Sequence, residues 1–247
     1  MDKAGKRHLL LLSSSKADET DYLAHATHWI TQFLDQAGVS SESNVLFVPF
    51  AGVSISYPEY TAKVSAALSQ LGLNIQCLGA SDDPLRSIKK ADVIIVGGGN
   101  TFHLLHQLYQ FDLIGPIRER VSQGVPYIGW SAGSNIATPS IKTTNDMPIV
   151  QPPSFQALNL VPFQINPHYI DGHPPGFHGE TRDDRLQEFM TVSPEVNIIG
   201  LPEGTGIQVI ENRLNLLGEK PIMHFHKGNR SILTAQLLET IYQQNVE

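Results

Sequence analysis

The sequence predicts a doubly wound α/β fold built on a mostly parallel β-sheet. Short apolar runs alternate with amphipathic segments through the first half of the chain, as strands and covering helices do in such a sheet. Hydrophobic residues make up 41% of the 247 residues and charged residues only 17%, against about 25% charged in typical soluble domains. This composition supports a sizeable core, and we expect one domain over residues 1–247.

Strands and helices are expected to alternate in a regular order. Short apolar runs predict buried strands at residues 8–12, 44–48, 74–78, 92–96 and 126–130. Helical segments are expected between them, at residues 20–37, 58–71, 101–110 and 114–122.

The second half of the chain is less regular. It is rich in Pro and Gly between residues 148 and 179, and a charged helical stretch follows at residues 180–191. Later strands are expected at residues 198–201, 206–210 and 214–217. Sheets of this class bind ligands at the carboxyl ends of their strands, so we expect the site there.

Composition also excludes several classes of protein. The chain has 17 basic and 24 acidic side chains and a net charge of −7, whereas a nucleic-acid surface would normally carry a basic stripe. Its one cysteine, Cys77, rules out an internal disulfide and is expected to be a buried core thiol. The apolar run at residues 9–12 is too short for a signal peptide or a membrane span. We therefore expect a cytoplasmic protein with a small-molecule partner, no nucleic acid and no membrane.

A G-x-S-x-G motif at residues 129–133 predicts a nucleophilic serine. An apolar strand precedes it and a plausible helix follows, which is the context that a nucleophile elbow requires. The flanking glycines, Gly129 and Gly133, allow a sharp turn that lifts the hydroxyl of Ser131 above the edge of the sheet.

A hydroxyl nucleophile needs a base, and the base needs an acid that orients it. Among ten histidines, His168 stands out because we interpret residues 166–169 as a proline-set loop that aims it into a site. The earlier His8, His25, His28, His103 and His106 are better interpreted as surface or core residues. Glu203 follows the expected strand 198–201. Spacing alone does not choose between it and its rivals Asp171, Glu180, Asp183 and Asp184.

The glycine-rich turn at residues 97–101 follows another expected strand and opens a helix. It lacks the dinucleotide-binding fingerprint. Its backbone N–H groups can instead stabilise an oxyanion, with the N–H of Ala132 as the second donor.

A metal site is not expected. His168, His173 and His178 recur every five residues, and His224 and His226 flank an aromatic residue. Neither set has the spacing of structural zinc sites or of zinc peptidases. We therefore expect no metal and no cofactor.

Seven segments together resemble the peptidase E family, the α-aspartyl dipeptidases of the serine-peptidase group that also includes cyanophycinase. They are residues 8–13 (HLLLLS), 97–101 (GGGNT), 129–133 (GWSAG), 143–150 (TTNDMPIV), 164–168 (QINPH), 179–182 (GETR) and 200–204 (GLPEG). The resemblance covers most of the chain. It implies a flavodoxin-like fold related to class I glutamine amidotransferases, with serine where those enzymes carry cysteine.

The resemblance also assigns roles to residues. It implies Ser131 as nucleophile, His168 as general base and Glu203 as orienting acid, with Gly99 and Ala132 forming the oxyanion hole. Arg182 matches the position that recognises the substrate aspartate, which suits a guanidinium because it grips carboxylates bidentately. Two further residues, Asn100 and Arg185, are candidate substrate contacts. Arg185 can also be interpreted as a surface partner of Asp183, Asp184 or Glu188.

Three functions remain open at this point. The first is a dipeptidase for Asp-X dipeptides, acting as a monomer or weak homodimer. The second is a cyanophycinase-like hydrolase of β-linked Asp-Arg, and the third is a non-catalytic module that binds small acidic peptides. Residues 171–178 and the tail after Gly218 follow no pattern of the family. Because the first of these lies between His168 and Arg182, we expect it to shape the mouth of the site.

Overall fold

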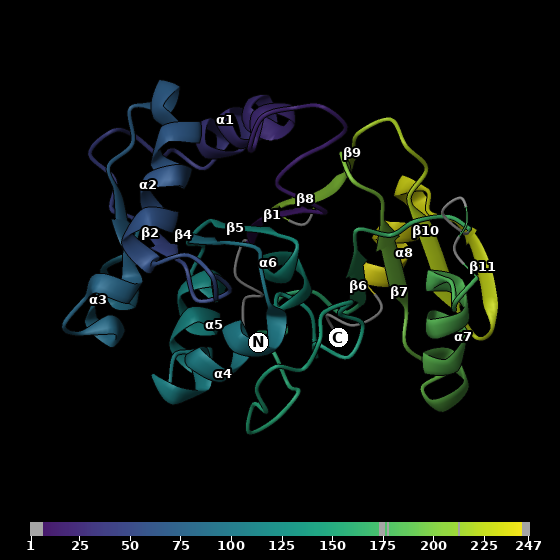
Figure 1. Cartoon of the computed structure of the whole chain (residues 1–247). Helices are drawn as coiled ribbons and strands as arrows, with labels where there is room; N and C mark the ends of the chain where they lie inside the picture. The colour runs from purple at the N-terminus through teal and green to yellow at the C-terminus, as the bar shows by residue number, and fades with distance from the viewer. Residues whose placement is uncertain (1–6, 173–175, 177, 212, 244–247) are drawn as a thin grey trace, which may run out of the picture.

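The computed structural model describes residues 7–172, 176, 178–211 and 213–243, and within them the strands form two sheets (Figure 1). The larger has seven strands in the order β3-β2-β4-β5-β1-β8-β9. Their bounds are β1 His8–Leu12, β2 Val45–Val48, β3 Ile75–Cys77, β4 Val93–Val96, β5 Tyr127–Trp130, β8 Gly206–Ile210 and β9 Arg213–Leu217. The first five run parallel, while β8 and β9 pair antiparallel. The mostly parallel α/β fold is confirmed.

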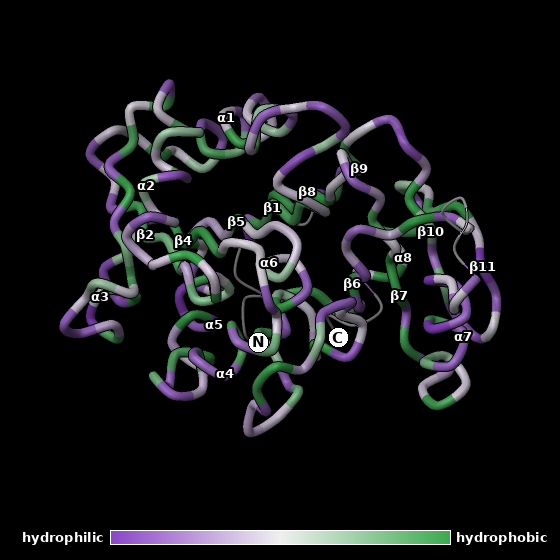
Figure 2. Tube along the Cα trace, in the orientation of Figure 1, coloured by the Kyte–Doolittle hydropathy of each residue, from purple (hydrophilic) through white to green (hydrophobic). Residues whose placement is uncertain are grey.

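Helices cover both faces of the large sheet because alternate side chains of each strand point to opposite faces. Leu10 and Leu12 of β1 pack with α1 (Thr27–Gln36) and α2 (Tyr57–Ala67). Leu9 and Leu11 of the same strand belong to the core on the other face. The helices on that face are α3 (Pro84–Lys90), α4 (Thr101–Gln110) and α5 (Ile114–Ser122), and Figure 2 shows the apolar strands between the two layers.

A second sheet of four strands, in the order β11-β10-β7-β6, lies beside the first (Figure 1). Its strands are β6 Gln164–Pro167, β7 Ile198–Leu201, β10 Met223–His226 and β11 Asn229–Ile232. Helix α7 (Arg182–Val192) packs on this sheet, and α8 (Ala235–Gln243) packs into the core of the large sheet. The expected strand 198–201 therefore forms, but in a sheet that the sequence did not predict.

The prediction of a loop at residues 166–169 is wrong for residues 166 and 167. Asn166 and Pro167 belong to β6, which pairs in parallel with β7 and lies at the edge of the small sheet. Proline has no N–H to donate, but an edge strand tolerates it because one side of the strand has no neighbour. His168 therefore follows directly on the carboxyl end of a strand.

Three other expectations differ in detail from the structure. The helix expected at residues 20–37 begins only at Ala24, with a 3-10 turn, because Leu23 adopts a left-handed conformation with φ 60°. The helix expected at 58–71 ends at Ala67 and is followed by the 3-10 turn Ser69–Leu71. Cys77 is only partly buried, because β3 is the edge strand of the large sheet.

Among the described residues, no helix is long and apolar enough to cross a membrane.

Two glycines are required where β5 turns into the following helix. A Cβ atom on Gly129 would lie 2.4 Å from the carbonyl oxygen of Gly133, and one on Gly133 would lie 2.2 Å from that of Val96. Gly129→Ala should therefore lower the free energy of unfolding by about 1–3 kcal/mol, the usual cost of overpacking. Urea denaturation measures this change.

Gly115 provides the matched control. It is a helical glycine of α5 with nothing within 4 Å of the added Cβ, so Gly115→Ala should stabilise the protein by roughly 0.5–1 kcal/mol. Equal stability of the Gly129 variant and the wild type would contradict the close approach.

Candidate active site

Ser131 lies on a sharp turn between β5 and the short helix α6 (Ala132–Asn135). Its backbone has φ 53° and ψ −114°, a conformation that L-residues rarely adopt. The buried Ser134 hydroxyl stabilises this turn, because it lies within hydrogen-bonding distance of the carbonyl oxygens of Leu12, at 2.6 Å, and Gly129, at 2.9 Å. This is the strand-turn-helix geometry that the G-x-S-x-G motif predicts.

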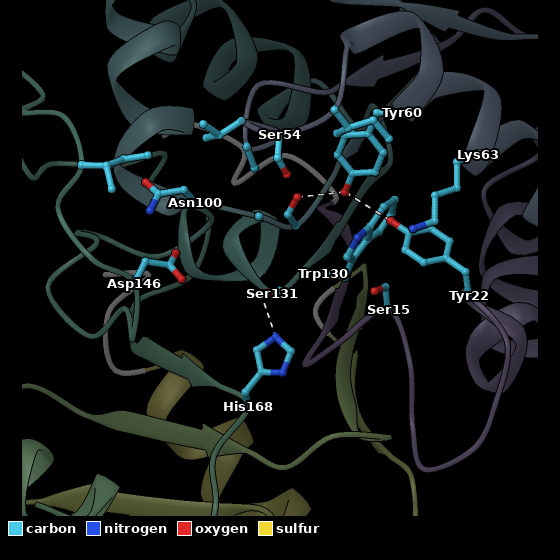
Figure 3. A pocket seen from close by; sticks show the side chains of 17 residues that line it. Ser15, Tyr22, Ser54, Tyr60, Lys63, Asn100, Trp130, Ser131, Asp146 and His168 are labelled. Atoms are coloured by element: carbon cyan, nitrogen blue, oxygen red, sulfur yellow. Dashed lines mark hydrogen bonds between the residues drawn. The ribbon is translucent and has the colours of Figure 1, made fainter. Parts of the chain in front are cut away.

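The structure brings His168 and Glu203 to this serine. His168 Nε2 lies 2.9 Å from Ser131 Oγ (Figure 3). His168 Nδ1 lies 2.6 Å from Glu203 Oε1. Ser131 follows β5 of the large sheet, whereas His168 and Glu203 follow the paired strands β6 and β7 of the small sheet. The three side chains therefore meet where the two sheets present their carboxyl ends.

The other carboxylates that the sequence left open have different partners. Asp171 and Asp183 pair with Arg230, and Asp183 also accepts a hydrogen bond from the Tyr169 hydroxyl at 2.6 Å. Glu180 lies against Arg185. The Asp184 carboxylate accepts from the N–H and hydroxyl of Thr181, the N-cap residue of α7. Glu203 is the carboxylate that contacts His168.

Ser13, immediately after β1, joins the two sheets and was missed by the sequence analysis. Its side chain is fully buried. The hydroxyl donates to the Leu201 carbonyl at 2.7 Å and accepts from the backbone N–H of His168 at 3.0 Å. One side chain thereby fixes the ends of both strands that carry His168 and Glu203. Nothing in the spacing of the sequence distinguishes it from the serines beside it.

The glycine-rich turn after β4 lies directly against Ser131. A Cβ on Gly98 would lie 3.0 Å from the Ser131 Cβ, and one on Gly99, whose φ is +134°, would lie 2.2 Å from the Ala51 carbonyl oxygen. The Tyr60 hydroxyl donates to the Gly98 carbonyl at 2.8 Å and so fixes this peptide. Ala132 begins α6, where an N–H has no acceptor within the helix. Of the two expected oxyanion-hole residues, Ala132 directly follows the serine, and Gly99 lines the same cavity as Ser131.

A cavity of about 580 Å³ opens above Ser131 and is lined by Gly99, Asn100, Asp146 and His168 among others (Figure 3).

Asn100 also has a structural role. Its Oδ1 accepts from the His103 N–H at 3.0 Å as the N-cap of α4, and its Nδ2 donates to the Met147 carbonyl at 2.9 Å. Asp146, which sequence reasoning did not single out, accepts from the N–H and hydroxyl of Thr101 at 2.7 and 2.6 Å.

Arg182 and Arg185 line a different cavity, of about 320 Å³, together with Asn145 and Gly172. The two cavities meet at neighbouring residues of the chain: Asp146 lines the cavity at Ser131, and Asn145 lines the cavity at Arg182. Burial lowers the pKa of Arg182, as does the neighbouring Arg185, whereas the Asp146 carboxylate raises it. Gly172 comes from the segment 171–178, of which Asp171, Gly172, Gly176 and His178 are described.

Among the described residues, no group of three or more His, Cys, Asp and Glu side chains is arranged to hold a metal ion. His168 contacts Ser131 and Glu203, and His224 Nε2 lies 2.8 Å from Asn197 Oδ1. His173 is outside the described residues.

The family model "Peptidase family S51" matches residues 9–217 of the chain. A relative from Shewanella putrefaciens (strain CN-32 / ATCC BAA-453), named peptidase E, is 52% identical over 216 residues, which are 87% of this chain and 89% of the relative. A relative of the same name from Shewanella sp. (strain W3-18-1) is 51% identical over the same shares of both chains.

Solved structures of similar fold come from two other bacteria. The crystal structure of a putative peptidase E protein from Listeria monocytogenes EGD-e has a TM-score of 0.63 and 25% identity, and the match covers 87% of this chain and all of that one. A peptidase from an acI-B1 actinobacterium has a TM-score of 0.66 at 15% identity over 94% of this chain and 95% of that one, a likeness of fold alone.

Removing the Ser13 hydroxyl should loosen the strand ends that position His168 and Glu203. Ser13→Ala leaves the His168 N–H without its acceptor and leaves the Leu201 carbonyl with the Tyr169 N–H as its remaining donor. The free energy of unfolding should therefore fall by about 1–3 kcal/mol. His168 would be held less firmly against Ser131, and labelling of Ser131 by a fluorophosphonate should slow. Mass spectrometry of the adduct over time gives the rate.

Ser122→Ala is the matched control, because this exposed serine bonds only locally, to the Glu119 carbonyl. A Ser13 variant that matches it in both stability and labelling rate would show that the junction does not depend on the hydroxyl.

Proposed function

Because the chain belongs to peptidase family S51, we propose that it cleaves dipeptides with an N-terminal aspartate, using Ser131, His168 and Glu203 as its catalytic triad. It is a serine-type dipeptidase, with relatives named peptidase E at 51–52% identity. One observation carries the proposal: His168 contacts both other residues, with Nε2 at 2.9 Å from Ser131 Oγ and Nδ1 at 2.6 Å from Glu203 Oε1.

In the proposed reaction, Ser131 Oγ attacks the carbonyl carbon of the aspartyl residue while His168 Nε2 accepts the hydroxyl proton. Glu203 holds the ring through Nδ1 and stabilises the imidazolium that forms. The N–H groups of Gly99 and Ala132 stabilise the oxyanion of the tetrahedral intermediate. His168 then returns the proton to the leaving amine as the C–N bond breaks. Water hydrolyses the resulting ester by the same route and releases aspartate.

We assign recognition of the substrate's side-chain carboxylate to Arg182, with Arg185 as a second contact. Within the described residues, Arg182 forms no ion pair with an acidic side chain, whereas Arg185 Nε lies 3.5 Å from Glu180 Oε2. A half-buried guanidinium without a carboxylate partner is suited to bind one from a ligand. Asn100 can contribute its second amide hydrogen, because one is already bonded to Met147.

Ser131→Ala should reduce kcat for Asp-Leu by more than about a thousandfold, because the nucleophile is lost and only binding and the oxyanion hole remain. The fold should persist, which circular dichroism and the melting temperature check. A panel of Asp-Leu, Asn-Leu and isoaspartyl-arginine identifies the substrate class.

Each of the other outcomes identifies a different function. Unchanged turnover by the Ser131 variant would refute the assigned nucleophile, and preference for isoaspartyl-arginine would indicate a cyanophycinase-like hydrolase. Absence of both turnover and fluorophosphonate labelling in the wild type would indicate a binding module.

Arg182→Ala should lower kcat/KM for Asp-Leu by roughly 10- to 100-fold. A hydrogen bond to a charged group contributes about 1.5–3 kcal/mol, and its loss corresponds to a change of this size. Asn-Leu, which lacks the side-chain charge, should be much less affected. Arg213→Ala, at an exposed arginine of β9, is the control. Equal losses on both dipeptides would mean that Arg182 has a structural role.

A further inference from the structure

Lys63 lines the same cavity as Ser131 and has no role in the mechanism above. Helix α2 begins with a capping box formed by Ser56 and Glu59. Tyr60 and Lys63 are three residues apart and therefore lie on one side of the helix. Both side chains line the cavity (Figure 3).

The position of the Lys63 ammonium is set by aromatic contacts. Its Nζ lies 4.2 Å from the centroid of the Tyr22 ring, a cation–π contact. The Tyr22 hydroxyl donates to the Tyr60 hydroxyl at 3.2 Å, and Tyr60 in turn donates to the Gly98 carbonyl. Lys63 is thereby linked to the turn that flanks Ser131. In the part of the chain that the structure describes, no acidic side chain pairs with it.

The cavity has opposite charges toward its two ends. Figure 3 shows Lys63 and Tyr22 on one side of Ser131 and Asp146 with Asn100 on the other. A free dipeptide is also charged at both ends, with an ammonium at its N-terminus and a carboxylate at its C-terminus. When the scissile carbonyl is placed at Ser131, the leaving residue must extend away from the aspartyl side.

We propose that Lys63 binds the free carboxylate of the leaving residue, and that the cavity wall at Tyr22, Ile55 and Lys63 forms the subsite for that residue. This inference rests on the proposed dipeptidase function. The wall combines one cation with apolar and aromatic surface, which fits an apolar side chain next to a carboxylate. A third residue would place a neutral peptide group where the carboxylate belongs, so Lys63 selects substrates by length.

The test compares Asp-Leu with Asp-Leu-amide, which differ only in the C-terminal group, a charged carboxylate in the first and a neutral carboxamide in the second. Wild-type enzyme should show a KM about tenfold lower for Asp-Leu, corresponding to ~1.4 kcal/mol. Lys63→Met should raise the KM for Asp-Leu to that of the amide, leave the KM for the amide unchanged, and change kcat less than about twofold. Lys63→Arg, which keeps the charge, should retain most of the discrimination.

Lys89→Met is the matched control, since Lys89 is exposed on α3 and does not line the cavity. It should behave as the wild type on both substrates. Raising the ionic strength should weaken Asp-Leu binding in the wild type more than in the Lys63→Met variant, because salt screens the charge pair.

Three results would overturn the inference. Wild-type enzyme that does not distinguish Asp-Leu from its amide, or a Lys63→Met variant that loses both equally, refutes the role of Lys63 while leaving the dipeptidase assignment intact. Wild-type enzyme that hydrolyses neither substrate refutes the proposed function, and the inference falls with it.

Discussion

The geometry of the candidate site depends on the junction between the two sheets, where the buried Ser13 hydroxyl bonds to the small sheet. Ser131 is fixed to the large sheet, while His168 and Glu203 are fixed to the small one. A small rotation of one sheet against the other would separate the hydroxyl from the imidazole. Ser13 opposes such a rotation because it bonds to the ends of both β6 and β7 from the end of β1. Its backbone N–H also donates to Thr205, on the far side of the Glu203 turn.

Backbone strain at the site is compensated by the packing around it. Ser131 and His168 both adopt positive φ, at 53° and 52°, a conformation that costs about 1–3 kcal/mol per residue when the side chain is not glycine. The flanking glycines and the buried hydroxyl of Ser134 leave the turn no room to relax. The side chains of Ser131 and His168 are therefore held in place by the fold itself, on strand ends rather than on long loops.

The sequence was informative where local periodicity decides the outcome. The expected strands of the large sheet form within a residue or two of their predicted bounds, and the G-x-S-x-G motif forms the expected turn. The sequence analysis did not predict the small sheet, because hydrophobic periodicity does not show which strands pair. Pro167 also led us to interpret the edge strand β6 as a loop. Ser13 acts across 155 residues of sequence, and Lys63 looks like any exposed helical lysine. Neither role has a local signal.

The long reach of the Ser13 junction has a consequence for biosynthesis. Strand β1 pairs with β5 on one side and with β8 on the other, where Leu12 is opposite Gly206. Its pairing is therefore complete only after β8 has been translated. Glu203 and Thr205 immediately precede β8. His168 lies 37 residues after Ser131, and Glu203 lies 35 residues after His168. The contacts from Ser131 through His168 to Glu203 can therefore form only after the segment that immediately precedes β8 has been translated.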